Sequence, residues 1–142
     1  LLFSPSPGLT DSKKIAGEIQ KEAGQEGCSC RLRLVEESDA LVYTSDMNGE
    51  KARMNLHEED VDLKNVGDGI PAELKDNQPY LLEYEHGSVT VSMVCLPKPC
   101  SGEGCEGFGV SATVTVLDGD RKDRFKAEGE CACAKKEEQE PS

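Results

Sequence analysis

The chain has 142 residues and a net charge of −12, with 28 Asp and Glu against 16 Lys and Arg. This length fits a single domain, and the acidic balance excludes the basic surface on which nucleic-acid binding depends, so no nucleic acid is expected as a partner. No apolar run reaches the ~20 residues of a transmembrane helix. An acidic surface attracts cationic partners, and charge therefore favours a cationic protein as the partner.

Aromatic residues make up only 4% of the chain, which has no Trp but seven Cys. A core this poor in aromatic residues needs other support, and disulfides are the usual supplement in small exported domains. We therefore expect an extracytoplasmic protein that is periplasmic, secreted or anchored to the envelope. Leu1 stands where an initiator Met is usual, which is typical of a processed end, and a signal peptide removed before Leu1 is one explanation.

The two ends of the chain differ from its middle. Residues 1–26 are expected to form a linker with a short helix or tether, because Thr10 or Ser12 can cap a helix there. The apolar stripe of that helix consists of Ile15, Ala16, Ile19 and Ala23. Residues 134–142 have nothing to bury and are expected to be a disordered, charged tail. The folded domain is thus predicted to span residues 27–133.

Inside that domain the apolar residues alternate with polar ones, which is the period of a β-strand. The predicted strands lie at residues 28–34, 41–46, 51–57, 61–63, 80–84, 89–95, 110–116 and 125–133. Asn48-Gly49 supplies the positive φ angles of a tight hairpin turn between two of them. This spacing predicts a mainly β fold, a single antiparallel barrel or sandwich of about eight strands.

Two Cys-x-Cys pairs bracket the domain, Cys28 with Cys30 and Cys131 with Cys133. Counting by twos along each strand places all four on the core face. Residues i and i+2 of an antiparallel ladder share one face and one hydrogen-bonding class, so Cys30 would oppose Cys131 if Cys28 opposed Cys133. One or two cross-strand disulfides are then reasonable, and closing a loop of about a hundred residues stabilises by ~4 to 5 kcal/mol. A tetrathiolate zinc site and a redox couple are the alternatives for these four residues.

Cys95, Cys100 and Cys105 surround a loop rich in Pro and Gly. One bridge among them, with Cys95 and Cys105 as the candidates, would fix this loop. Because seven is an odd number, one thiol stays free or pairs outside the chain, and Cys100 in the middle of the loop is the candidate.

The sequence offers little catalytic chemistry and favours a non-enzymatic protein over an enzyme, with no cofactor. Only His57 and His86 can act as a base near neutral pH, and neither has a nucleophile motif nearby. No catalytic residue is assigned, and a hydrolase is the least favoured alternative. Glu58, Glu59 and Asp60 are read as a charged loop and as the candidate contact for a cationic partner.

The stretches Gly27-Cys28-Ser29-Cys30 and Gly129-Glu130-Cys131-Ala132-Cys133 resemble those of a set of small secreted, uncharacterised bacterial proteins. In these, too, two Cys-x-Cys pairs bracket a domain with a central cysteine loop. The chain is also similar, more loosely, to the periplasmic inhibitors of c-type lysozyme, which are small antiparallel barrels. Their inhibitory Ser-Gly-x-x-Tyr loop is not present here, so this resemblance implies an architecture and a possible inhibitor role without assigning an inhibitory residue.

Overall fold

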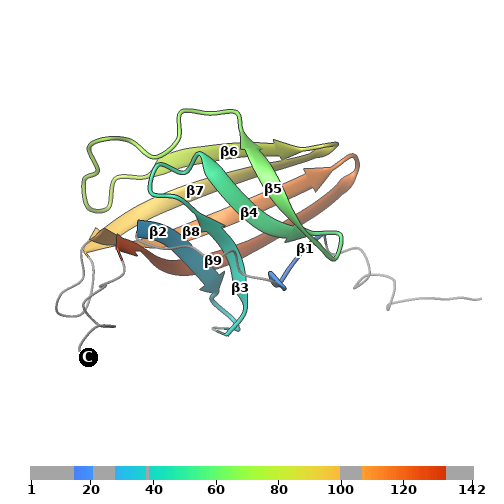
Figure 1. Cartoon of the computed structure of the whole chain (residues 1–142), viewed down its shortest axis with the longest axis horizontal. Coiled ribbons are helices and arrows are strands. Elements are labelled where there is room, and N and C mark those ends of the chain that lie inside the picture. The colour runs from blue at the N-terminus through green and yellow to red at the C-terminus, as the bar shows by residue number, and fades with distance from the viewer. Residues whose placement is uncertain (1–14, 21–27, 38, 100–106, 134–142) are drawn as a thin grey trace, which may run out of the picture.

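A computed structural model describes residues 15–20, 28–37, 39–99 and 107–133 and contains a nine-stranded sheet (Figure 1). In chain order the strands are β1 (Ala16–Gly17), β2 (Cys28–Leu34), β3 (Leu41–Ser45), β4 (Lys51–Leu56), β5 (Glu59–Asn65), β6 (Tyr80–His86), β7 (Val89–Pro99), β8 (Gly107–Asp118) and β9 (Arg121–Cys133). The described residues contain no helix, and thus none that is long and apolar enough to cross a membrane.

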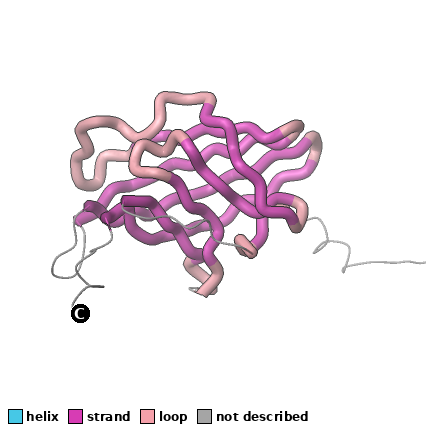
Figure 2. The backbone as a smooth tube through the Cα atoms, in the orientation of Figure 1, coloured by secondary structure: helices cyan, strands magenta, loops and turns pink. Residues whose placement is uncertain are grey.

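The strands β2 to β9 form a closed barrel in which each strand pairs antiparallel with the next along the chain. The first and last of these, β2 and β9, also pair with each other and close the ring. The choice between sandwich and barrel is thereby decided, and Figure 2 shows the strands wrapping around one interior. Closure leaves no edge strand in the ring itself.

The alternation seen in the sequence is the alternation between the interior and the outer face of this barrel. Along β7, Val89, Val91, Met93 and Cys95 are buried, and the residues between them are exposed or half-buried. On β8 the buried residues are Val110, Ala112, Val114 and Val116. β-Branched residues pack well on such a pleated surface, which is how a chain without Trp fills its core.

The prediction of a helix around Ile15 is wrong for the part of it that the structure describes. Ala16 and Gly17 form the short strand β1, which pairs antiparallel with Leu56 and Asn55 of β4. The carboxylate Oδ2 of Asp123 on β9 accepts hydrogen bonds from the backbone N–H of Ile15 at 3.2 Å and of Ala16 at 3.0 Å. Ile15 and Ile19 are buried, so this segment belongs to the core, and long-range backbone pairing overrides the local helical spacing.

Two hairpin turns differ in detail from their prediction. At Asn48-Gly49 only Gly49 has a positive φ, of 72°, and the Asp46 carboxylate accepts a hydrogen bond from the Glu50 N–H at 2.9 Å. The segment read as a charged loop is instead a tight turn in which His57 and Glu58 have φ of 53° and 69°, and Glu59 already belongs to β5. Residues other than Gly rarely adopt this conformation, which is why the sequence did not indicate the turn.

Gly129 of β9 lies opposite Leu32 where the backbone of β2 passes close to it. A Cβ added there would collide with the carbonyl oxygen of Arg31 on β2. We expect Gly129→Ala to lower the free energy of unfolding by about 1 to 3 kcal/mol, because the two strands must separate to admit the methyl group. Gly109→Ala is the matched control, since its added Cβ finds the carbonyl oxygen of Pro99 at 3.5 Å, an ordinary contact. Urea unfolding of the two variants measures the difference, and equal stabilities would contradict the close approach.

Candidate functional site

The four bracketing cysteines form two disulfides, Cys28–Cys133 and Cys30–Cys131. The register between β2 and β9 places the members of each pair directly opposite one another, as the parity argument predicted. Cys30 and Cys131 are each only 2% exposed, whereas Cys28 at the end of its strand is exposed. With these bonds formed, none of the four sulfurs is a thiolate that could bind zinc, and the disulfides indicate an oxidising environment.

Three tyrosines project into the barrel interior, two of them joined by a hydrogen bond. The hydroxyl oxygens of Tyr43 and Tyr84 are 2.6 Å apart, and Tyr84 donates to the carbonyl oxygen of Gly49 at 2.7 Å. Because Tyr84 uses its only proton on Gly49, the Tyr43 hydroxyl must be the donor between the two. Burial raises the pKa of Tyr43, Tyr80 and Tyr84, so all three hold their protons well above neutral pH.

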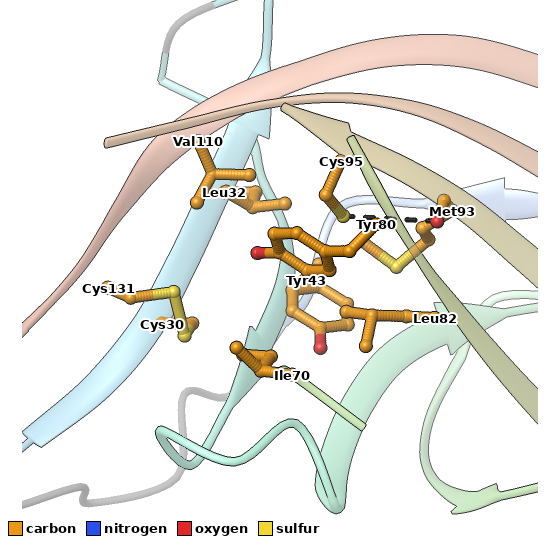
Figure 3. Close-up of a pocket in the computed structure, with 10 residues that line it drawn as sticks. All are labelled: Cys30, Leu32, Tyr43, Ile70, Tyr80, Leu82, Met93, Cys95, Val110 and Cys131. Carbon is orange, nitrogen blue, oxygen red and sulfur yellow. Dashed lines mark hydrogen bonds between the residues drawn. A yellow bond between two sulfur atoms is a disulfide. The ribbon is translucent and has the colours of Figure 1, made fainter. Parts of the chain in front are cut away.

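A small cavity remains between Tyr43, Tyr80 and the inner disulfide (Figure 3). Its lining comprises Cys30, Leu32, Tyr43, Ile70, Tyr80, Leu82, Met93, Cys95, Val110 and Cys131. The cavity has a volume of about 10 Å³, room for about one water molecule, whereas ligand sites are typically of about 300 to 1,000 Å³. Ile70 reaches this space from the β5–β6 connection, which the hydrogen bond from the Ile70 N–H to the carbonyl of Asn48 fixes at 2.9 Å. The interior at this level is therefore packed core.

Cys95 is a free thiol in the structure, not the disulfide partner that the sequence suggested. It is 1% exposed and on the same inward face as Val91 and Met93, so its side chain points into the barrel interior. Burial raises its pKa to about 12, although a hydrogen bond with Tyr80 acts in the opposite direction. The other two cysteines of the predicted cluster, Cys100 and Cys105, lie outside the described residues.

A buried thiol with a raised pKa should be unreactive while the barrel is folded, because the thiolate is the nucleophile. We expect alkylation of Cys95 at pH 8 to be at least about a hundredfold slower in the native protein than in guanidinium without reductant. Mass spectrometry of alkylated peptides resolves this position from Cys100 and Cys105. Native labelling of Cys95 at the denatured rate would contradict its place in the core.

At one end of the barrel three hairpin turns meet around Asp118. Its Oδ2 lies 2.7 Å from Nε2 of His57 in the β4–β5 turn, and its Oδ1 accepts a hydrogen bond from Ser88 in the β6–β7 turn at 2.8 Å. The Ser88 hydroxyl and the His57 imidazole lower the pKa of Asp118. An imidazole activates a serine as a nucleophile by accepting its hydroxyl proton. The Ser88 hydroxyl donates to the Asp118 carboxylate instead, so His57 does not activate it in this arrangement. The cluster joins the three hairpins.

The candidate contact residues lie at this same end of the barrel but are not equivalent. Glu58 and Glu59 are exposed. Asp60 is half-buried, and its Oδ1 accepts hydrogen bonds from the Asn55 side chain at 3.0 Å and from the Gln20 N–H at 2.9 Å. Asp118 is the last residue of β8, and Asp120 lies in the adjoining β8–β9 turn. We call Glu58, Glu59, Asp60, Asp118 and Asp120 the acidic end; Glu58, Glu59 and Asp120 are its exposed members.

Sequence reasoning missed the residues that hold distant elements together. The alternation of β6 places Tyr80 and Tyr84 inward, but the partner of Tyr84 is on β3, across the barrel. Asp123 lies on the inward face together with Phe125 and Ala127, and a carboxylate at a core position is the signal that could have identified it as a partner for unpaired backbone N–H groups.

In class, then, the chain is a disulfide-closed, eight-stranded antiparallel barrel with one additional strand. Comparison with protein-family models, curated proteins and solved structures finds no match. The resemblances to secreted bacterial proteins and to lysozyme inhibitors thus receive no support from these comparisons, and function has to be argued from this chain's own surface.

Proposed function

We propose that this protein is a non-enzymatic binding protein of an extracytoplasmic compartment, and that it contacts a cationic protein with its outer surface. The observation that carries the proposal is the packed interior, where the cavity measures about 10 Å³. An eight-stranded barrel can hold a small ligand when its interior is empty, but this interior is occupied by tyrosine, leucine and sulfur side chains. Binding at the surface is the mode that this packing favours.

The two disulfides support the proposed compartment. Structural disulfides persist in secreted and periplasmic proteins and are rare in the cytosol. Both bridges join the first and the last strand of the ring, so they secure its closure. The secreted, periplasmic and envelope-anchored locations all provide the oxidising conditions that these bonds need, and we propose this group of locations.

The acidic end supports a cationic protein as the partner. Glu58, Glu59 and Asp120 are exposed on turns that the His57–Asp118 interaction holds side by side. Acidic residues on adjoining fixed turns give a concentrated negative potential, which steers a cationic partner and raises its association rate at low salt. The strongly basic c-type lysozyme is the first partner to test, with its inhibition as an additional readout.

The test compares two double variants that each remove two negative charges. Glu58→Gln/Glu59→Gln alters the acidic end, and Glu73→Gln/Asp76→Asn alters exposed positions in the β5–β6 connection at the opposite end of the barrel (Figure 1). We expect the first variant to slow association with lysozyme by about threefold to tenfold at low salt and to flatten the salt dependence, and the second to leave both unchanged. Association rates from surface plasmon resonance provide the measurement.

Two results would overturn the proposal for this partner surface. Equal weakening by both variants would mean that overall charge alone attracts the cation. Binding that is retained at high salt in Glu58→Gln/Glu59→Gln would mean that the contact is not electrostatic and lies elsewhere on the barrel.

A further inference from the structure

The outer face of β7 and β8 carries no charged side chain over most of its length. Between the turn that joins β6 to β7 and the far ends of the strands, its outward residues are Thr90, Ser92, Val94, Leu96, Ser111, Thr113, Thr115 and Leu117. Val94 and Leu117 are 52% and 41% exposed. The chain as a whole is 31% charged, so an uncharged area across two strands is a departure from its general character. We call it the uncharged face.

The preference of β-strands for Thr and Val does not explain this absence of charge, because the outward positions of neighbouring strands are charged. On β9 they include the cations Lys122, Arg124 and Lys126, and on β6 they include the anions Glu83 and Glu85. None of these five side chains forms an ion pair within the part of the chain that the structure describes. Beside Thr113, Thr115 and Leu117 the uncharged face is therefore bordered by cations on β9, and beside Ser92 and Thr90 by anions on β6. Further along β9, the anion Glu128 lies opposite Ser111, and on β5 Lys64 lies opposite Glu85 without an ion pair.

The registers of the strands place these borders at matching heights. Arg124 is opposite Thr115, Thr115 is opposite Ser92 and Ser92 is opposite Glu83, so Arg124 and Glu83 are the two ends of one row across β9, β8, β7 and β6. The adjacent row runs in the same way from Lys122 through Leu117 and Thr90 to Glu85. Each row has a cation at one end and an anion at the other.

We propose that the uncharged face binds the same face of a second copy of this chain. A two-fold axis parallel to the strands and between β7 and β8 exchanges β7 with β8 and β6 with β9 while each row keeps its height. Glu83 of one copy then faces Arg124 of the other, and Glu85 faces Lys122. A two-fold axis makes each contact twice, and charge complementarity at the borders selects this pairing over others.

The net charge limits which faces of two copies can approach one another. Two copies with a net charge of −12 each repel one another, and the uncharged face with its cationic border is where that repulsion is locally reversed. Four strands spaced about 4.8 Å apart and about eight residues long cover roughly 500 Å² of the barrel wall. Because this wall curves away toward β6 and β9, the area in contact is smaller, well below the ~800 Å² per partner of a standard stable interface. The dimer is therefore weak and depends on concentration.

The experiment is sedimentation velocity of the full chain from roughly 10 μM to roughly 1 mM, the range in which small interfaces associate. We expect the wild-type protein to shift from monomer to dimer over this range. Arg124→Glu and Glu83→Arg should each raise the dissociation constant at least about tenfold, because each places like charges opposite one another. Lys75→Glu, an exposed position in the β5–β6 connection, is the matched control for charge and should dimerise more tightly than Arg124→Glu.

The double variant Glu83→Arg/Arg124→Glu is the decisive arm. Reversing both charges restores the pairing between copies, so the dissociation constant should return to within about threefold of the wild-type value. The rescue cannot come from an ion pair within one copy, because three strand spacings, about 14 Å, separate β6 from β9. Far-UV circular dichroism of each variant checks that the barrel is intact.

Three outcomes would overturn the proposed dimer: a monomer at every concentration, association that Arg124→Glu does not weaken, or a double variant that stays as weak as its parents. None of these residues belongs to the acidic end, so failure of the dimer is distinguishable from failure of lysozyme binding.

Discussion

Replacing one disulfide with a pair of serines should lower the free energy of unfolding by about 2 kcal/mol, and replacing both should lower it by about 7 kcal/mol. The combined loss exceeds the sum of the two single losses, because the bridges are nested. They connect residues 105 and 101 positions apart in the sequence, and their cysteines are only two residues apart on each strand.

The chain-entropy model explains this excess. When one bridge is present, the other closes a ring of about six residues, whose closure entropy is worth about 2 kcal/mol, whereas the first bridge to form closes about a hundred residues and is worth about 5 kcal/mol. The variants are Cys28→Ser/Cys133→Ser, Cys30→Ser/Cys131→Ser and the quadruple substitution. Removing the buried Cys30–Cys131 bridge should lower the free energy of unfolding somewhat more than removing Cys28–Cys133, because the two new serine hydroxyls are polar groups in the core.

Chemical denaturation of the three variants measures these losses. Cys95→Ser, which removes a free thiol, shows what a buried Cys-to-Ser change costs without any loss of a bridge. Losses that add would mean that the two bridges constrain the unfolded chain independently, and the nested geometry would be wrong.

The second large effect is a loss of stability in alkali. Burial raises the pKa of Tyr43, Tyr80 and Tyr84 in the folded protein, whereas in the unfolded chain tyrosine titrates near pH 10. A raised pKa in the folded state means that this stability is fully present below about pH 10 and is lost as the pH rises beyond it. Above about pH 10, where the unfolded chain loses the tyrosine proton, each tyrosine that stays protonated in the fold lowers the free energy of unfolding by about 1.4 kcal/mol for every further pH unit.

Tyr43 and Tyr84 together should therefore remove about 3 kcal/mol per pH unit above about pH 10, and Tyr80 adds to this loss because its pKa is raised as well. Urea unfolding between about pH 8 and about pH 11.5 measures the slope. The ultraviolet absorbance of tyrosinate follows ionisation directly, because the chain has three Tyr and no Trp.

Tyr43→Phe/Tyr84→Phe removes two of the three ionising groups, and its alkaline slope should fall to that of Tyr80 alone. Ionisation of all three tyrosines near pH 10 in a barrel that remains folded would contradict their placement in the core.

The barrel was predictable from the sequence where its cause is local. Alternation of apolar and polar residues gave the inward face of each strand, and the same count placed Cys30 and Cys131 on the core face. Their opposition was expected only if Cys28 opposed Cys133, and the register between β2 and β9 confirms that pairing. These features depend on the two-residue period of a strand, which a single sequence displays directly. The strand ends were less accurate, and β8 and β9 extend further than their alternation suggested.

What the sequence could not indicate depends on contacts between distant residues. Ile15 and Ile19 are spaced as in a helix, yet the partners that hold this segment extended are Asp123 and Leu56, which the chain brings close only by closing the barrel. The Asp118–His57 contact likewise joins two turns from separate hairpins. The uncharged face emerges only when the registers of β6 to β9 align their outward residues.

The most direct test of this account is peptide mapping of the unreduced protein, because ring closure between β2 and β9 underlies the fold, the compartment and the packed interior. After tryptic digestion, we expect the peptide that holds Cys28 and Cys30 to remain linked to the peptide that holds Cys131 and Cys133, with a mass four hydrogens below the sum of the reduced peptides. Two unlinked peptides, each with an internal Cys-x-Cys bridge or with free thiols, would contradict the disulfide-closed barrel.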